Sequence, residues 1–477
     1  MSSDRPAPAG AGQAQADWTA PGAPGPVRAV VRLPGSKSMT NRALIIAALS
    51  DTPVLIAGPL AARDTQLMAA ALRALGCRIT EGKHEWRVER VERPRPAPAG
   101  PTGAGQPDDA VSDGVRPRAS ASVDVGNAGT VLRFVPPVAA LADADVRFTG
   151  DQRITQRPVR PLLQALRELG AEIEDGGTGA VPFTVHGRGR LPGGAVTIDA
   201  SSSSQLVSGL LLAGARYDAG ATITHSGPPV PSAPHIEMTV RMLRAAGLHV
   251  EGPAVSGRPD QPVWRVWPGQ VRAERIEVEP DLSNALPFLA AALATGGEVT
   301  MAGWPADSLQ PASTIVELLV SMGADVALSG DGLRVRGSGR IDGVRADLSQ
   351  VGELTPVLTA LAALAGSPSE FTGIGHLRRH ESDRLAALAA EVGKLGGRVT
   401  ETADGLRIRP VPLHPADEGF DSHDDHRLVM AAAVLGLRTG GLTIRNAATV
   451  GKTFPGFAAA WTGLLTPAPP MPPAPPA

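Results

Sequence analysis

The chain has 477 residues, which exceeds the length of one ordinary hydrophobic core and predicts two domains. A net charge of −2 and an aromatic content of 3% give no reason to expect nucleic acid or an anionic membrane surface as a partner, and a hydrophobic content of 43% is typical of a folded protein. The single cysteine, Cys77, excludes an internal disulfide framework, and with an N-terminus that lacks a basic region and an apolar core it predicts a cytoplasmic protein.

Three segments have a composition that does not favour a packed core. Residues 1–27 and 466–477 are rich in Ala, Pro and Gly, and we expect them to be disordered tails. Residues 93–119 have the same bias and are predicted to be a low-complexity insertion.

The first predicted element of the folded part is a polar, cationic turn over residues 33–42 that opens into an apolar helix over 43–50. A helix N-terminus offers free N–H groups and a positive dipole end, and here Lys37 and Arg42 add full charges. This design suits an anion, although an ordinary helix cap beside a solvated lysine explains the stretch equally well when it is taken alone.

The same design recurs six times at a period of roughly 70–90 residues. Each unit has a polar start, an apolar helix of small residues, a turn and a short β-branched strand. The six copies cover residues 37–58, 127–150, 201–227, 281–303, 347–375 and 423–447, and their strands are predicted at 54–56, 146–148, 221–223, 298–301, 370–372 and 442–444. The first helix of each unit has no polar face, so we expect it to be buried on all sides.

Each copy continues with an amphipathic helix and further strands. These helices are predicted at residues 65–76, 160–170, 236–247, 314–323, 383–396 and 457–465. The first five end at Gly76, Gly170, Gly247, Gly323 and Gly396, where a left-handed residue that closes a helix is usually glycine. The pattern predicts α/β units with helices in the middle and sheets around them.

The polar starts carry the residues with chemistry. They supply the Asn127–Arg133 turn, the serine row 201–204 with Gln205, and the short turn at Ser232. The cations at these starts are Lys37, Arg42, Arg133, Arg153, Arg157, Arg384, Arg427 and Lys452. Each segment alone could be a cap, a linker or a surface turn. Together, in a nearly neutral protein, they predict binding of a small molecule with two anionic groups, a phosphate and a carboxylate.

Three carboxylates lie among these cations: Glu353, Glu381 and Asp425. Each could form a structural ion pair or, in a closed site, act as a general acid or base. The chain has neither a phosphate loop of the Walker type nor a dinucleotide fingerprint, and no spacing of His and Cys predicts a metal site. We therefore expect no nucleotide, metal or other cofactor.

A set of motifs over about residues 28–460 resembles the 5-enolpyruvylshikimate-3-phosphate (EPSP) synthase family of enolpyruvyl transferases, in a variant similar to actinobacterial forms. In chain order the motifs are Leu-Pro-Gly-Ser-Lys-Ser at 33–38 with Asn41-Arg42, Asn-Ala-Gly-Thr at 127–130 with Arg133, Gly-Asp-Gln-Arg at 150–153 with Arg157-Pro158, Ser-Ser-Gln at 203–205, Asp-Arg-Leu at 383–385, Asp-His-Arg at 425–427 and Lys-Thr-Phe-Pro at 452–455. As an ordered set they are very specific.

The resemblance implies a fold: a two-domain inside-out α/β barrel in which each domain has three repeated units of the βαβαββ type. Residues 28–36 and 280–465 would form the lower, C-terminal domain, and residues 37–279 the upper, N-terminal domain. It also implies a monomer that binds only small molecules.

The implied reaction transfers the enolpyruvyl group of phosphoenolpyruvate to the 5-hydroxyl of shikimate 3-phosphate through a tetrahedral intermediate, with release of phosphate. Shikimate 3-phosphate would contact Lys37, Ser38, Arg42, Ser203, Ser204, Gln205, Ser232, Glu353 and His380. Phosphoenolpyruvate would contact Lys37, Gly129, Arg157, Gln205, Arg384, Arg427 and Lys452. Catalysis would rest on Glu353 as base, Glu381 as acid, and Lys37 and Lys452. Inhibition by glyphosate next to Gly129 is also implied.

Four positions depart from the family pattern. Glu353 stands where the family usually has Asp, His380 where it has Lys, His376 where it has Asn, and His235 where it has Tyr. We expect phosphate affinity to fall as the pH rises through the pKa of His380. The alternatives are a UDP-N-acetylglucosamine enolpyruvyl transferase, which shares the fold and the donor, and a non-catalytic scaffold that binds anions.

Overall fold

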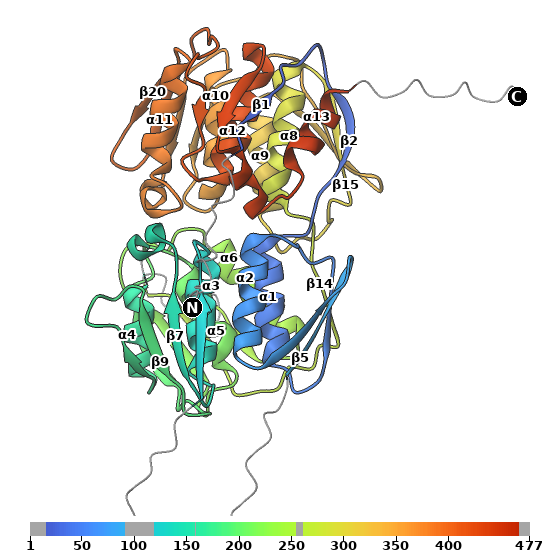
Figure 1. The fold of residues 1–477 in the computed structure, drawn as a ribbon. Coiled ribbons are helices and arrows are strands. Elements are labelled where there is room, and N and C mark those ends of the chain that lie inside the picture. Colours follow the sequence, from blue (N-terminus) through green and yellow to red (C-terminus); the bar gives the residue numbers. More distant parts are fainter. Residues whose placement is uncertain (1–15, 91–118, 158, 254–260, 467–477) are drawn as a thin grey trace, which may run out of the picture.

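Two hydrophobic cores, each built around a layer of buried helices, organise the computed structural model, which describes residues 16–90, 119–157, 159–253 and 261–466. One core draws its residues from Met39 to Val278 and defines the N-terminal domain. The other draws on Ala20 to Val31 and on Leu282 to Leu464 and defines the C-terminal domain. Figure 1 shows the two domains as separate bodies, with the C-terminal domain drawn at the top.

The central helices are the first helices of the six repeats. They are α1 (Lys37–Ala48), α3 (Gly129–Ala139) and α5 (Gln205–Gly214) in the N-terminal domain, and α8 (Leu282–Thr295), α10 (Thr355–Ala363) and α12 (His426–Thr439) in the C-terminal domain. Almost every residue of these helices is buried, as their lack of a polar face predicts. Helix α3 packs on α5, and α12 packs on both α8 and α10.

The second helices lie outside this layer. They are α2 (Arg63–Ala74), α4 (Arg160–Glu168), α6 (Pro234–Ala245), α9 (Ala312–Ser321), α11 (Arg384–Lys394) and α13 (Phe457–Leu465). The glycines predicted to close the first five have φ between 81° and 103°. This left-handed backbone confirms the predicted role, because a Cβ would be strained there. Four short 3-10 helices complete the described helices: η1 (Gln152–Gln156), η2 (Gly352–Leu354), η3 (Gly375–Arg379) and η4 (Ala447–Lys452).

The described strands form six separate small sheets. Three of them belong to the N-terminal domain. The first has the strand order β14 (Arg275–Glu277), β3 (Val54–Ala57), β5 (Glu85–Arg90) and β4 (Cys77–Glu81), and the second has the order β6 (Ser120–Asp124), β7 (Asp145–Thr149), β9 (Phe183–His186) and β8 (Glu172–Glu174). The third has the order β10 (Gly194–Ile198), β11 (Ala221–His225), β13 (Val263–Val266) and β12 (Val250–Glu251).

The C-terminal domain has β16 (Asp325–Ser329), β17 (Gly332–Arg336), β15 (Glu298–Ala302) and β2 (Arg28–Arg32); β18 (Arg345–Asp347), β19 (Ser369–Thr372), β21 (Leu406–Arg409) and β20 (Arg398–Glu401); and a three-stranded sheet of β1 (Trp18–Ala20), β23 (Leu442–Arg445) and β22 (Phe420–Asp421). In every four-stranded sheet one parallel pair joins an antiparallel hairpin. The predicted βαβαββ unit and the placement of the sheets around the helices are confirmed.

Two strands are exchanged between the domains. Strand β2 directly precedes α1 in the chain, yet it pairs in parallel with β15 of the C-terminal domain, and β14 instead supplies the parallel partner of β3. The chain therefore crosses between the domains twice, side by side. At the crossing the N–H of Ser36 donates to the carbonyl of Glu279 at 2.8 Å, and the N–H of Asp281 donates to the carbonyl of Pro34 at 3.0 Å. This double crossing places the start of α1 against the start of α8.

The prediction that residues 1–27 form a disordered tail is wrong for the last residues of that segment. Residues 18–20 form β1, which pairs antiparallel with β23, and Ala20 is completely buried. Within the described residues no hairpin follows α13, and a strand from the other end of the chain forms the edge of the last sheet. A three-residue strand in a Pro- and Gly-rich context has too little periodicity to be recognised.

The other low-complexity segments fall almost entirely outside the described residues. Of the insertion predicted at 93–119 only Ala119 is described, and of the tail predicted at 466–477 only Thr466. Among the helices that the structure describes, none has the length and apolar character needed to cross a bilayer.

Candidate active site

The cleft between the two domains is closed by contacts along both of its rims. On one rim the N–H of Ser232 donates to the carbonyl of Ser349 at 2.8 Å. On the other, Nε of Arg153 donates to the carbonyl of Glu381 at 3.1 Å, and Nζ of Lys452 donates to the carbonyl of Asn127 at 3.1 Å. The structure is thus in a closed state, with a cavity held between the domains.

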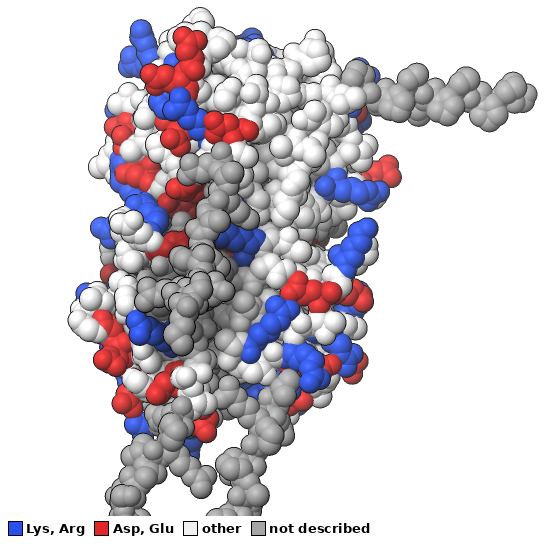
Figure 2. All heavy atoms as spheres, in the orientation of Figure 1, with Lys and Arg blue, Asp and Glu red and all other residues white. Residues whose placement is uncertain are grey.

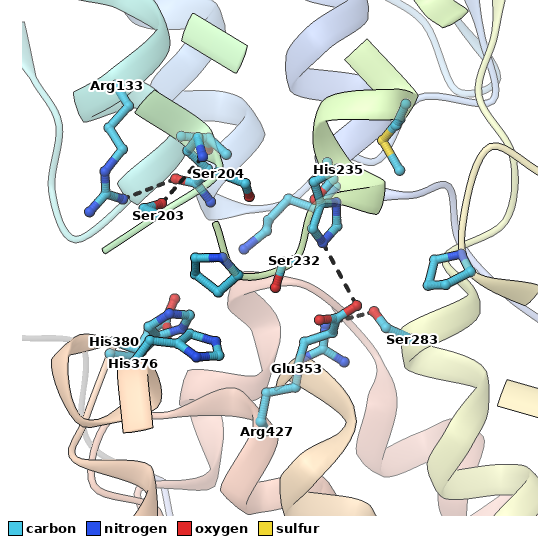
Figure 3. Close-up of a pocket in the computed structure, with 18 of the residues that line it drawn as sticks. Arg133, Ser203, Ser204, Ser232, His235, Ser283, Glu353, His376, His380 and Arg427 are labelled. Carbon is cyan, nitrogen blue, oxygen red and sulfur yellow. Dashed lines mark hydrogen bonds and ion pairs between the residues drawn. The ribbon is translucent and has the colours of Figure 1, made fainter. Parts of the chain in front are cut away.

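The starts of the central helices from both domains line this cavity (Figure 3). Its charged and polar lining comprises Ser36, Lys37, Ser38, Thr130, Arg133, Arg157, Ser202, Ser203, Ser204, Gln205, Ser232 and His235 from the N-terminal side, and Asp281, Ser283, Gln310, Glu353, His376, Arg379, His380, Glu381, Arg384, His426 and Arg427 from the C-terminal side. Free N–H groups and positive dipole ends therefore converge on one space, as a polyanion requires.

Cations at the cleft differ from cations on the surface. On the face drawn in Figure 2, basic and acidic side chains are interspersed. Exposed arginines such as Arg190 and Arg336 are paired with carboxylates, Arg190 with Asp218 at 2.7 Å and Arg336 with Glu298 at 2.7 Å. The lining of the cleft, in contrast, has six Lys and Arg side chains against three carboxylates, so positive charge is in excess there.

Lys37 is the first residue of α1 and is held from two directions. Its Nζ donates to Oδ2 of Asp64 at 3.2 Å, and its backbone N–H donates to Oδ2 of Asp281 at 3.3 Å. Asp64 is only 2% exposed, so the ammonium is anchored from behind while it faces the cavity. The Oγ of Ser36 caps the helix by accepting from the N–H of Met39.

The serine row forms the opposite part of the N-terminal wall. Ser203 and Ser204 lie in the turn before α5, and Oγ of Ser203 accepts from the N–H of Gln205 at 3.3 Å. The Oε1 of Gln205 in turn accepts from Nη1 of Arg133 at 3.0 Å. In Figure 3 these residues stand together on one side of the cavity. They offer uncharged hydroxyls and an amide beside a fixed guanidinium, which suits a phosphorylated sugar-like molecule.

Gly129 lies directly against the two arginines of this wall. A Cβ at this position would approach Nη2 of Arg157 to 2.5 Å and Nη1 of Arg133 to 2.7 Å. Arg157 is buried, and its Nη1 donates to the carbonyl of Asn127 at 3.1 Å. The absence of a side chain at residue 129 therefore sets the position of both guanidinium groups.

Glu381 is the meeting point of the site. Its Oε2 accepts from Nη2 of Arg384 at 2.9 Å, and its Oε1 lies 3.5 Å from Nζ of Lys452 and 3.8 Å from Nη1 of Arg157. Burial would raise the pKa of this carboxyl, but the charges of Lys452, Arg157 and Arg384 outweigh burial and hold the pKa well below its usual range. In this state Glu381 is a carboxylate that occupies the centre of a cationic site.

Asp425 has a structural role. As the N-cap of α12 it accepts from the N–H of Arg427 at 2.9 Å, and its two oxygens accept from Nε and Nη2 of Arg384 at 2.8 and 3.2 Å. It is completely buried. Of the two interpretations that the sequence leaves open, the structure favours the ion pair: Asp425 aims Arg384 at Glu381.

Glu353 lies on η2, in the part of the C-terminal wall that faces His235. Its Oε1 lies 3.7 Å from Nε2 of His235, which comes from α6 of the N-terminal domain (Figure 3). Burial would raise the pKa of Glu353, but the contact with His235, a backbone hydrogen bond and the charge of Arg427 together outweigh burial and lower it. Glu353 is thus ionised and can accept a proton.

The structure brings nearly all the predicted residues together. Those that line the cavity are Lys37, Ser38, Arg157, Ser203, Ser204, Gln205, Ser232, Glu353, His380, Glu381, Arg384 and Arg427. Lys452 reaches Glu381 from an adjoining groove.

Arg42 is an exception, since the structure places it behind the wall of the cleft. It is 1% exposed, and its guanidinium donates to Oγ1 of Thr239 at 2.7 Å and to the carbonyls of Ser38 and His235 at 2.9 Å each. With a contact to Oγ of Ser208, these contacts occupy four of its five N–H groups within the N-terminal domain. In this structure Arg42 positions the backbone of two residues that line the cavity, and its direct contact with a ligand stays a prediction.

Sequence reasoning overlooked several residues of the site. Asp64 anchors Lys37 but lies in an amphipathic helix without a motif. Asp281 and Ser283 line the cavity at the start of α8, and Oγ of Ser283 accepts from Nη2 of Arg427 at 2.7 Å. The polar start of the fourth repeat was the available signal for these two. Among the described residues, no group of three or more His, Cys, Asp or Glu is arranged to hold a metal ion.

Comparison with known proteins identifies the family. The family model for EPSP synthase (3-phosphoshikimate 1-carboxyvinyltransferase) matches residues 21–102 and 110–461. The chain belongs to the EPSP synthase family. The resemblance stated from the motifs is thereby confirmed.

Solved structures agree with this assignment. A 2.37 Å structure of EPSP synthase from Acinetobacter baumannii has a TM-score of 0.70 at 25% identity, covering 94% of this chain and 97% of that chain. A second structure of EPSP synthase from the same organism has a TM-score of 0.69 at 25% identity, with coverages of 92% and 96%. The enolpyruvyl transferase NikO from Streptomyces tendae has a TM-score of 0.67 at 17% identity, with coverages of 93% and 96%, and shares the fold. The protein is a two-domain α/β enzyme that carries out enolpyruvyl transfer.

Proposed function

We propose that the cleft holds shikimate 3-phosphate against the N-terminal wall and phosphoenolpyruvate among the cations that meet at Glu381. The family reaction is transfer of the enolpyruvyl group of phosphoenolpyruvate to the 5-hydroxyl of shikimate 3-phosphate, with release of phosphate, a step of the shikimate pathway that leads to aromatic amino acids. The residues proposed to contact shikimate 3-phosphate are Lys37, Ser38, Ser203, Ser204, Gln205, Ser232, Glu353 and His380. Those proposed to contact phosphoenolpyruvate are Lys37, Gly129, Arg157, Gln205, Arg384, Arg427 and Lys452.

The first chemical step forms a tetrahedral intermediate. The 5-hydroxyl oxygen bonds to C2 of phosphoenolpyruvate while Glu353 takes the hydroxyl proton. At the same time C3 gains a proton from Glu381 and becomes a methyl group. An ionised base and a protonated acid on opposite sides of the reacting atoms are the arrangement that this addition needs.

Glu381 must hold a proton for this step, and the substrate supplies the reason. In the free enzyme Lys452, Arg157 and Arg384 keep the pKa of Glu381 low. The phosphate and carboxylate of phosphoenolpyruvate would bind these cations and offset their charge, so the pKa of Glu381 rises once the donor is bound. Glu381 therefore becomes a protonated acid only when phosphoenolpyruvate is bound.

The second step breaks the bond between C2 and the phosphate oxygen, and phosphate leaves with the electron pair. Glu381 takes a proton back from C3, which restores the double bond, and the proton on Glu353 departs with phosphate. Lys37 and Lys452 stabilise the negative charge that develops on the leaving group. The closed rims exclude water from the intermediate.

The observation that carries this proposal is that buried cations from both domains converge on one buried glutamate within a closed cavity. The test is an assay of phosphate release with phosphoenolpyruvate and either shikimate 3-phosphate or UDP-N-acetylglucosamine. We expect release only with shikimate 3-phosphate. Release only with the UDP-sugar would identify the sister activity, and release with neither would indicate a binding scaffold.

We also propose that the protein acts as a monomer in the cytoplasm. The two domains of one chain form both walls of the closed cavity. Size-exclusion chromatography with light scattering should give a mass near 48.9 kDa. The cytoplasmic location rests on composition and on the unpaired thiol of Cys77.

A further inference from the structure

Histidine is concentrated at the cleft. The chain has 10 histidines, and the cavity is lined by four of them, namely His235, His376, His380 and His426. His376 and His380 form a pair on η3 and the residue that follows it, with ring centroids 5.5 Å apart in an edge-to-face arrangement. Figure 3 shows this histidine pair on the C-terminal side of the cavity, opposite the serine row. Uncharged hydroxyls and imidazoles therefore face each other across the same space.

His380 is surrounded by both signs of charge. Its Nδ1 lies 4.0 Å from Oε2 of Glu381. The charges of Arg384 on α11, Arg157 beside η1 and His376 also act on the His380 ring. Burial and then the charge of Arg384 lower its pKa well below the usual value, with Glu381 opposing them. At neutral pH the imidazole of His380 is uncharged while the cleft holds no ligand.

His376 is in a similar state. Burial and then Arg384 lower its pKa, while Glu353 on η2, the backbone at Gly373 and Asp404 between β20 and β21 oppose them. Its Nε2 is buried and has no hydrogen-bond partner among the described residues. The histidine pair thus contains a nitrogen that is still available and two rings that can each accept a proton.

We propose that binding of shikimate 3-phosphate is coupled to uptake of about one proton by the histidine pair, which lines the cavity opposite the serine row. The proposal rests on the placement of shikimate 3-phosphate proposed above. A dianion in a buried cavity favours a positively charged neighbour strongly, and two rings 5.5 Å apart repel each other when both are charged, which limits uptake to one proton. A lysine would hold its charge permanently, whereas these rings become charged only when the ligand arrives.

This coupling predicts the direction of pH dependence. If one proton is taken up, the dissociation constant of shikimate 3-phosphate rises up to about tenfold per pH unit between the pKa of the pair in the free and in the bound enzyme. Above pH 7 the phosphate monoester is already largely a dianion, since its second pKa is about 6. The range from pH 7 to 8.5 therefore reports the protein and not the ligand.

Isothermal titration calorimetry of the full chain tests the proposal. Shikimate 3-phosphate is titrated alone, because phosphoenolpyruvate would also change Glu381, in two buffers of different ionisation enthalpy. The wild type should take up about one proton at pH 7.5. Its dissociation constant for shikimate 3-phosphate should rise several-fold to tenfold for each unit of increase in pH. His380→Lys should bind without proton uptake and with affinity that is nearly constant from pH 7 to 8.5. The matched control, His84→Gln, alters an exposed histidine between β4 and β5 and should behave as the wild type.

Two results would overturn the proposal. Binding of shikimate 3-phosphate to the wild type without proton uptake means that the pair stays neutral. Equal uptake in the wild type, His380→Lys and His376→Asn means that another group takes the proton. If shikimate 3-phosphate does not bind the wild type at all, the proposed placement of the substrate fails first, and the coupling fails with it.

Discussion

The two walls of the cleft are built from the same repeated unit but present different chemistry. The N-terminal wall offers the serine row, Gln205 and arginines that are fixed by hydrogen bonds. The C-terminal wall holds the half-buried Glu353, the buried Glu381 and the histidine pair, and the buried Asp425 supports it. Permanent charges and hydroxyls bind a ligand at any pH near neutrality, whereas coupled carboxylates and imidazoles exchange protons. We infer that the N-terminal wall mainly recognises shikimate 3-phosphate and that the C-terminal wall mainly carries out the proton transfers.

The largest expected effect comes from removing the acid of the C-terminal wall. Glu381→Gln keeps the size of the side chain but can no longer transfer a proton, so we expect kcat to fall about 10³-fold while the affinity for shikimate 3-phosphate changes little. Steady-state kinetics and calorimetry measure the two quantities. Glu370→Gln, which alters a partly exposed carboxylate on β19 of the same domain, is the control and should keep full activity. A kcat within tenfold of the wild type would contradict the assignment.

The corresponding change in the N-terminal wall should affect binding. The double variant Ser203→Ala and Ser204→Ala loses two hydroxyls that face the cavity, and hydrogen bonds to a charged group contribute about 1.5–3 kcal/mol each. We expect KM for shikimate 3-phosphate to rise roughly 10²- to 10⁴-fold with little change in kcat. A loss of kcat at unchanged KM would show that the two walls do not divide the work in this way.

A smaller effect is expected where the two walls meet. In Gly129→Ala the new Cβ would lie 2.5 Å from Nη2 of Arg157, so the guanidinium must move away from its present position. We expect the inhibition constant of glyphosate and KM for phosphoenolpyruvate both to rise about tenfold. Gly393→Ala, on the open side of α11 with no atom near the added Cβ, should change neither constant. Unchanged glyphosate inhibition in Gly129→Ala would remove Gly129 from the donor site.

The smallest effect concerns the contact that joins the walls at Glu353. The His235 ring lowers the pKa of this base in the free enzyme, and kcat/KM therefore falls only when the pH drops below the usual carboxylate range. Loss of the ring in His235→Gln should raise the pKa of Glu353 and move the acid limb of the kcat/KM profile to higher pH. An acid limb at the same pH in both proteins would mean that Glu353 is not the base that limits activity.

Local pattern was sufficient for much of the architecture. The apolar character of the first helices, the amphipathic second helices and the glycines after them depend on neighbouring residues, so the repeats and the buried layer could be predicted. The exchange of β2 and β14 and the edge strand β1 could not be predicted from the residues themselves. Each depends on pairing with a strand hundreds of residues away, which no local periodicity records.

The residues of the site show the same distinction between local sequence pattern and long-range contact. The residue types at the helix starts could be predicted from the chain alone, because capping turns and cationic motifs are short and continuous. The contacts of each side chain depend on the folded molecule: Arg42 supports the wall from behind, Asp425 aims Arg384, and cations from both domains meet at Glu381. The reason is geometric, since the helix starts converge only after each domain has folded around its own core and the double crossing has brought α1 against α8.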